Sequence, residues 1–247
     1  MELPAIAQRL RATPLGRAFE AHLYRGDEVE CPCCGGSFRR FAPYGLRPRR
    51  PFARCPGCGA MERHRHLWLF LRRRTDLFTR PQRLLHFAPE AVFRGGLAGL
   101  PHLDYVTADL APGRAAVRVD IARVPFADGS FDAILCNHVL EHVTDDRRAM
   151  AELLRVLRPG GWAIVQVPQR SRMPATLEDA SVTDPRERAH RFGQSDHLRL
   201  YGGDYADRLR EAGFAVTVER FGDGLPAEVR TRHGLKSERI HVCRRPG

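Results

Sequence analysis

The sequence predicts an α/β protein, in which a seven-strand, mostly parallel sheet is covered by helices and follows a small cysteine-rich module. Two observations carry this prediction. Copies of the phrase Cys-Pro-x-Cys-Gly begin at Cys31 and at Cys55. From Arg83 onward, short apolar runs alternate with helical segments, which is typical of a sheet covered by helices.

The composition fits a globular protein. Of the 247 residues, 43% are apolar, and no apolar run approaches the roughly 18 residues that a membrane span needs. Glu2 stands where a signal peptide needs positive charge, so we expect a cytoplasmic protein. The net charge of +11 comes almost entirely from arginine, with Lys236 as the single lysine. A diffuse arginine surface is the commoner origin of such a charge, and nucleic-acid binding stays open as the alternative.

The cysteine-rich module is built on two similar turns, "CPCCG" from Cys31 and "CPGCG" from Cys55. Pro fixes one backbone torsion angle and Gly permits a positive one, so that two thiolates converge in each turn. The pair predicts a zinc ribbon with the ligands Cys31, Cys34, Cys55 and Cys58. Four protein ligands leave zinc no open position, which favours a structural ion. Cys33 is expected to be a bystander, with ligation in place of Cys34 as the alternative.

Four segments are expected along the chain. They are an N-terminal helix and linker at 1–30, the ribbon at 31–60, a connecting helix at 61–80 and the sheet domain at 81–247. The connecting helix follows from Leu67, Phe70 and Leu71 at helical spacing, in a stretch without Gly or Pro. We expect its basic residues at 63–66 to form a solvated face.

The sheet domain contains seven candidate strands, at 83–87, 103–107, 116–119, 131–136, 162–167, 215–220 and 239–243. Helices are expected at 145–157, which "RPGG" ends, and at 203–212. The last two strands follow each other without an obvious helix, so we expect one of them to be antiparallel at the sheet edge. Cys136 and Cys243 lie in apolar strands and are expected to be buried.

In an open α/β sheet, ligands bind outside the carboxyl ends of the strands. Asp120 closes the third strand and can accept a hydrogen bond from an amino group such as that of adenine. Ile121 and Phe126 offer apolar surfaces to a purine. Asn137 and His138 end the fourth strand, at the floor of the expected cleft.

The segment "DIARVPFADGSFDAILCNHVLEHVTDDRRAMAELLRVLRPGGWAIVQVP" resembles the central half of a class I S-adenosylmethionine-dependent methyltransferase of the type-11 group. The turn "VPFADGSFD", the "LEH" and the "RVLRPGG" carry the resemblance, which extends loosely over 83–242. It implies a Rossmann-like fold, bound S-adenosylmethionine and methyl transfer to a nucleophile. Asp109 would bind the ribose hydroxyls, and Asp120 and Ile121 would meet the adenine. The full set of expected cofactor-binding residues is Phe87, Ala88, Glu90, Asp109, Asp120, Ile121, Phe126 and Asn137.

The chain departs from this family in the turn after the first strand, where "LLHFAPEAVFRGGL" replaces the usual glycine-rich sequence. Ala88 is small enough to replace one glycine, and Glu90 could bind the ammonium group of the cofactor. Pro89 removes a backbone N–H. We therefore expect either a cofactor that lies slightly differently or a specialised subfamily with a rebuilt turn. "LHFAPE" and "CPxCGAxERHR" together resemble a bacterial methyltransferase subfamily that begins with a zinc ribbon.

Methyl transfer from a sulfonium is an in-line displacement for which a base is optional. A hydroxyl or a protonated amine must lose a proton to a base, whereas a carboxylate or thiolate acceptor needs none. His197 is the first candidate base and His138 the second. The segment 169–200 is expected to be a lid or binding loop. The expected substrate-binding residues are His142, Gln194, Asp196 and Arg199.

Three functions are compatible with these features. The first is a methyltransferase that acts on a small metabolite, a sugar or a peptide group. The second is an RNA methyltransferase that reads RNA through the ribbon, whose region offers the aromatic side chains Phe38, Phe41, Tyr44 and Phe52 for stacking on bases. The third is a binding module on a methyltransferase fold without catalysis.

Overall fold

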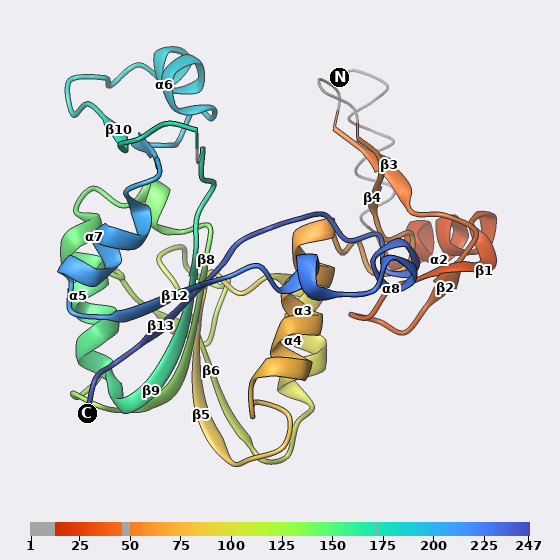
Figure 1. The fold of residues 1–247 in the computed structure, drawn as a ribbon, viewed down its shortest axis with the longest axis horizontal. Coiled ribbons are helices and arrows are strands. Elements are labelled where there is room, and N and C mark those ends of the chain that lie inside the picture. The colour runs from red at the N-terminus through yellow and green to blue at the C-terminus, as the bar shows by residue number, and fades with distance from the viewer. Residues whose placement is uncertain (1–12, 46–49, 171) are drawn as a thin grey trace. The chain divides into compact units, whose positions relative to one another are not determined.

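The computed structural model describes residues 13–45, 50–170 and 172–247, which divide into two compact units (Figure 1). The first unit comprises the described parts of Met1–Thr79, Glu90–Leu100 and Arg220–Glu238, and the second comprises Arg80–Pro89, Pro101–Glu219 and Arg239–Gly247. The chain thus passes between the units several times, whereas the segments expected from the sequence are contiguous. Those segment boundaries stay a prediction.

Within the described residues, the second unit contains a sheet of seven strands in the order β12-β13-β9-β8-β5-β6-β7. The strands are β5 (Gln82–Phe87), β6 (Leu103–Asp109), β7 (Val117–Arg118), β8 (Phe131–Asn137), β9 (Leu157–Gln166), β12 (Ala215–Glu219) and β13 (Ile240–Arg244). The predicted Rossmann-like, seven-strand sheet is confirmed. One of the last two strands is antiparallel, as predicted, because β13 pairs antiparallel with both β9 and β12. Its predicted place at the sheet edge was wrong, since β13 lies between these two strands and β12 forms the edge. The long connection at 220–238 lets β13 return beside β9.

One face of the sheet is covered by α5 (Asp146–Val156) and α7 (Tyr205–Glu211), which confirms the two helices predicted there (Figure 1). Met150 and Leu209 from these helices join Ile134 of β8 in one apolar core. The central strands are buried almost without interruption, as parallel strands in such sheets are. Cys136 and Cys243 are buried as expected, and burial raises the pKa of the Cys243 thiol.

The segment 169–200 has structure of its own. It forms the short strands β10 (Leu177–Glu178) and β11 (Arg199–Leu200), which pair antiparallel, and the helix α6 (Pro185–Phe192). Val182, Phe192 and Leu200 make a small apolar cluster within it. The segment is therefore a packed element in this structure, and its role as a lid stays a prediction.

From residue 13 onward, where the described part of the first unit starts, the first element is α2 (Pro14–Leu23), which Thr13 caps by accepting a hydrogen bond from the Gly16 N–H. Of the helix and linker expected at 1–30, residues 1–12 lie outside the described residues. The ribbon follows as two antiparallel strand pairs. Its strands are β1 (Arg25–Glu30), β2 (Ser37–Phe38), β3 (Ala42–Tyr44) and β4 (Arg50–Arg54).

The connecting helix predicted after the ribbon is confirmed as α3 (Glu62–Arg74). It packs against α4 (Ala91–Ala98), where the indole of Trp68 stacks on Phe93 with ring centroids 5.8 Å apart. A Cβ atom at Gly96 would come within 2.5 Å of that indole, so this close packing requires glycine. The unit also contains η2 (Phe221–Gly224) and α8 (Ala227–Arg232).

The prediction that residues 63–66 of α3 form a solvated face was wrong. Arg63 is exposed, but the other three basic side chains are buried, and Arg65 is fully so. The Arg65 guanidinium lies 3.7 Å from the centroid of the Phe41 ring and is surrounded by backbone acceptors. It donates hydrogen bonds of 2.8–3.0 Å to the carbonyls of Ala53, Ala60, His233 and Gly234. These acceptors offset the cost of burying the charge.

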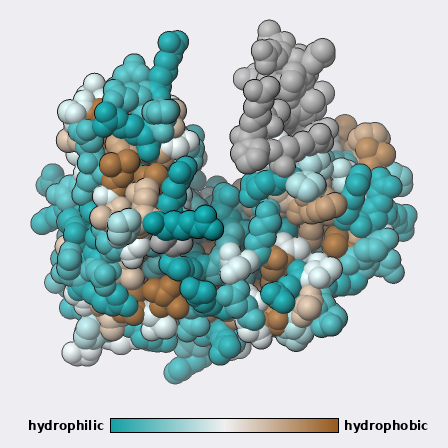
Figure 2. All heavy atoms as spheres, turned by 45° about the horizontal axis from the view of Figure 1, so that its top comes forward, coloured by the Kyte–Doolittle hydropathy of each residue, from teal (hydrophilic) through white to brown (hydrophobic). Residues whose placement is uncertain are grey.

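The visible face of the molecule is mostly hydrophilic (Figure 2). Leu15, Phe19 and Leu23 of α2 are among the exposed large apolar residues. No helix in the described ranges is both long enough and apolar enough to cross a membrane.

We predict that Arg65→Ala lowers the free energy of unfolding by about 3 kcal/mol, because it leaves buried carbonyls of three segments without their donor. Urea unfolding measures the change. Arg63→Ala, two positions away on the exposed side of α3, is the matched control and should change stability by no more than about 0.5 kcal/mol. Equal effects of the two substitutions would contradict this account.

Candidate functional site

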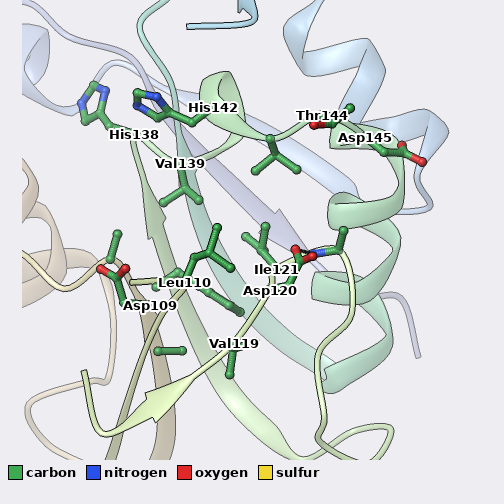
Figure 3. A pocket seen from close by; sticks show the side chains of 15 residues that line it. Asp109, Leu110, Val119, Asp120, Ile121, His138, Val139, His142, Thr144 and Asp145 are labelled. Carbon is green, nitrogen blue, oxygen red and sulfur yellow. Dashed lines mark hydrogen bonds between the residues drawn. The ribbon is translucent and has the colours of Figure 1, made fainter. Parts of the chain in front are cut away.

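A cavity of about 360 Å³ lies in the second unit, at the carboxyl ends of the parallel strands (Figure 3). This volume falls in the range of small-molecule sites. Five of the predicted cofactor-binding residues line it, namely Phe87, Ala88, Asp109, Asp120 and Ile121. The structure therefore has a cavity at the strand ends, where the sequence predicts the site.

Two residues with unusual backbone conformations lie at this cavity. Among the described residues other than glycine, only Ala88 and His138 have a positive φ, of 44° and 55°. They follow β5 and β8, and their N–H groups donate to the carbonyls of Ala108 and Gln166, both at 2.8 Å. A left-handed conformation costs a residue with a Cβ atom about 1–2 kcal/mol, and such strain clusters at functional sites. Ala88 thus adopts the conformation that glycine usually supplies.

Two carboxylates project from the ends of neighbouring strands into the same region (Figure 3). Asp109 ends β6, and its Oδ1 accepts a hydrogen bond of 2.8 Å from the Ala111 N–H. Asp120 follows β7, and its Oδ1 accepts one of 2.9 Å from the Ala122 N–H. Each carboxylate is therefore oriented by the turn that carries it. The buried Ile121 side chain adds an apolar surface beside Asp120.

Three of the predicted cofactor-binding residues do not line this cavity. Phe126 packs edge-on against Phe131, with ring centroids 5.0 Å apart, and joins the apolar core. Glu90 precedes α4 and belongs to the first unit. Asn137 is buried at the end of β8, with 4% of its surface exposed.

The turn that holds Phe126 is supported by α5. Arg155 donates hydrogen bonds of 2.8 Å to the carbonyls of Val124 and Phe126, while Glu152 accepts one of 2.8 Å from the Val124 N–H. Hydrogen bonds from Arg155 lower the pKa of Glu152. The "VPFADGSFD" and "RVLRPGG" motifs therefore contact each other, and this contact shapes the loop after β7.

The predicted histidines lie after β8 and near the segment 169–200. His138 and His142 line the cavity, and His142 belongs to the turn η1 (Leu140–His142). His197 is buried, with 2% of its surface exposed, and is not among the lining residues. The rings of His142 and His197 meet edge-on with centroids 4.9 Å apart.

The predicted substrate-binding residues have different environments. Gln194 and Asp196 are exposed, whereas Arg199 is buried with 4% exposure. Arg199 donates to backbone carbonyls of the loop that forms one cavity wall, those of Leu140 at 2.8 Å, Thr144 at 2.9 Å and Val143. It also pairs with Glu178 at 3.1 Å. These hydrogen bonds indicate that Arg199 positions the 140–144 loop at the cavity wall and does not itself contact a ligand there.

Several lining residues were missed by the sequence analysis. They are Ala108, Leu110, Val119, Ala122, Val139, Val143, Thr144 and Asp145. Most are small or apolar and carry no chemical signature. Their position directly after a predicted strand, in "LAP" after β6 and "VLEHVTD" after β8, was the signal that could have identified them.

Comparison with known proteins agrees with this architecture. Residues 99–165 match the family model described as a methyltransferase domain. A solved S-adenosylmethionine-dependent methyltransferase from Mesorhizobium loti superposes with a TM-score of 0.51 at 20% identity, over 72% of this chain and 97% of that one. The chain thus has the fold of a class I methyltransferase and matches a methyltransferase-domain model over residues 99–165.

Two curated relatives also match parts of this chain. A Mycolicibacterium smegmatis protein named "Probable S-adenosylmethionine-dependent methyltransferase" is 35% identical over 141 residues, 53% of this chain and 50% of that protein. A demethylmenaquinone methyltransferase from Beutenbergia cavernae is 46% identical over 54 residues, 22% of each chain. The chain thus spans half or less of the length of these relatives.

We predict that Arg199→Ala destabilises the methyltransferase domain by about 3 kcal/mol, because the carbonyls of the 140–144 loop lose a buried donor and Glu178 loses a partner. Thermal and urea unfolding measure the loss. Arg210→Ala removes an exposed arginine that pairs with Asp207 on the same helix, so it serves as the control, with an expected effect within about 0.5 kcal/mol. A wild-type stability of Arg199→Ala would rule out the positioning role.

Proposed function

We propose that the second unit binds S-adenosylmethionine in its cavity and transfers the methyl group to a small-molecule acceptor. The observation that carries this proposal is that Ala88, Asp109 and Asp120, at the ends of three neighbouring strands, line one cavity. The match of residues 99–165 to a methyltransferase family supports it.

The lining residues fit the parts of this cofactor. Asp109, oriented by the Ala111 N–H, suits hydrogen bonding to ribose hydroxyls. Asp120 suits the amino group of adenine, and Ile121 provides an apolar surface for the ring. The glycine-like turn at Ala88 brings backbone close to the cavity, where it would meet the methionine part.

The sulfonium supplies an activated methyl carbon, so the protein contributes mainly proximity and alignment. Of the two predicted bases, His138 lines the cavity, and its Nδ1 lies 3.4 Å from a carboxylate oxygen of Glu141. That neighbour would stabilise the imidazolium formed when His138 accepts a proton from the acceptor. We therefore assign the base role to His138, and the base role of His197 stays a prediction.

The burial of aromatic side chains in the ribbon favours a small-molecule acceptor over RNA. Phe38 and Phe41 are buried in the ribbon core with 5% and 1% exposure, which leaves Tyr44 and Phe52 as exposed aromatic residues there. The burial of Arg65 removes a further charge from that surface. The name of the Beutenbergia cavernae relative states a small-molecule acceptor for that protein, which supports the same class here.

We predict that the protein binds S-adenosylhomocysteine, and that Asp109→Ala and Asp120→Ala each weaken binding by about 1–3 kcal/mol, or roughly 5- to 150-fold, through loss of charged hydrogen bonds. Isothermal titration calorimetry measures the affinities. Asp104→Ala removes an exposed aspartate from the opposite end of β6 and should leave the affinity unchanged. Wild-type affinity in both test variants would exclude this cavity as the cofactor site.

We further propose that the first unit holds a structural zinc ion on Cys31, Cys34, Cys55 and Cys58, whose sulfurs lie within 4.8 Å of one another. The Sγ atoms of Cys31 and Cys58 are 3.6 Å apart, and those of Cys34 and Cys55 are 3.8 Å apart. Tetrahedral Zn–S bonds of about 2.3 Å place sulfurs about 3.8 Å apart. The donors therefore fit zinc. Cys33 is not part of this group.

Both cysteine turns support this site with the same backbone geometry. The Cys31 and Cys55 N–H groups donate to the carbonyls of Gly36 at 2.9 Å and Ala60 at 2.8 Å. Gly35 and Gly59 have φ angles of 71° and 81°, the left-handed conformation expected of the glycine in each turn.

We predict one zinc ion per chain by metal analysis, lost in Cys55→Ser together with the folded ribbon, because so small a module buries too little apolar surface to fold without it. Thermal unfolding should show a lower midpoint for that variant. Cys33→Ser, in which the spare cysteine is changed, should keep both zinc and stability. Full zinc content in Cys55→Ser would count against the site.

A further inference from the structure

A second group of metal-ligand side chains lies in the methyltransferase domain. Glu141, His142 and His197 each offer one oxygen or nitrogen atom, and these three atoms lie within 4.8 Å of one another. The group joins η1 to the segment 169–200, and the Leu198 N–H donates to the Glu141 carbonyl at 2.8 Å beside it. The backbone thus holds the two parts of the group together.

The hydrogen bonds of the two imidazoles determine which nitrogen is available to an ion. Nδ1 of His142 lies 3.2 Å from the carbonyl oxygen of Asp196, and Nδ1 of His197 lies 3.1 Å from that of Phe192. A carbonyl oxygen only accepts, so each Nδ1 carries hydrogen and each Nε2 has a lone pair. Metal-binding histidines have this arrangement, in which the other ring N–H donates to a carbonyl.

Two of the available atoms are buried without a partner. Nε2 of His197 and Oε2 of Glu141 have no hydrogen-bond partner within the described part of the chain. Their side chains are among the most buried polar groups, with 2% and 1% exposure. Buried acceptors without a donor are rare because they are costly, and a ligand, a water molecule or an ion is the usual partner of such an atom.

We propose that Glu141, His142 and His197 bind a divalent transition-metal ion at the wall of the cofactor cavity. Two neutral imidazoles and one carboxylate suit zinc, manganese, iron or cobalt rather than magnesium or calcium, which prefer oxygen ligands. Ligand atoms around such an ion lie about 3.3 Å apart, so the group contracts on binding. The His142 ring, whose side chain is 36% exposed, has room to turn.

The ion would bind the methyl acceptor. This role in the reaction rests on the proposed methyl transfer. Three protein ligands leave coordination positions open, and His142 also lines the cavity. An acceptor hydroxyl bound there loses its proton to His138 or to solvent, because the positive ion lowers the hydroxyl pKa. Its oxygen then takes the methyl group as the carbon–sulfur bond breaks, and neutral S-adenosylhomocysteine leaves. The substrate class is thus a hydroxyl compound.

Co²⁺ titration of protein whose cysteines carry zinc tests this site. We expect one Co²⁺ per chain, with visible absorption bands and without the intense charge-transfer absorption that thiolate ligands produce. Glu141→Gln and His197→Gln should weaken Co²⁺ binding at least about 100-fold. His190→Gln, which changes an exposed histidine of α6, should bind Co²⁺ as the wild type does.

Circular dichroism and zinc content check that each variant is folded. Absence of Co²⁺ uptake by the wild type, or unchanged affinity in both Glu141→Gln and His197→Gln, overturns the proposal. Binding of S-adenosylhomocysteine is measured separately on the same samples. Co²⁺ uptake that depends on Glu141 supports the metal site even where that cofactor does not bind, so the two proposals fail independently.

Discussion

The cavity depends on the register of three parallel strands. Phe87, the last residue of β5, pairs with Ala108 of β6 on one side and with Cys136 of β8 on the other. The three strands therefore end within one residue of each other, and Ala88, Asp109 and His138, which lie at or directly after their ends, come to the same edge. A shift of one residue in any pairing would turn the apolar side chains of that strand to the opposite face. Burial of the strands thus also sets the position of the site.

In both units, arginine side chains stabilise irregular segments by binding their backbone carbonyls. The number of arginines in the sequence alone does not indicate this role. Arg65 binds carbonyls of the ribbon and of the 233–234 turn, Arg155 binds the loop after β7, and Arg199 binds the loop after β8. A guanidinium carries five donors in a fixed plane, so one side chain can serve several carbonyls of an irregular segment. Part of the positive charge therefore stabilises loops within the protein.

The strands and the edge of the sheet that carries the cavity could be predicted because their signals are local. An apolar run bounded by turns predicts a buried strand, and a carboxylate at its end predicts a ligand contact, as for Asp109 and Asp120. Phe126 was assigned to the cofactor because an aromatic residue in a turn fits a binding surface and a core equally well. The buried state of Arg65 and Arg199 was not predictable, because the acceptors that stabilise them come from distant parts of the chain.

The hydrogen bond between Arg65 and the 233–234 turn affects how the first unit folds during synthesis on the ribosome. Arg65 lies 168 residues before His233, whose carbonyl it binds. At about 5–20 residues per second, translation takes about ten to thirty seconds to cover that distance. Throughout that interval the nascent ribbon and α3 lack the turn at 233–234, whereas β5, β6 and β8 can already pair. The amino-terminal part of the chain is thus made first but can be completed only near the end of synthesis.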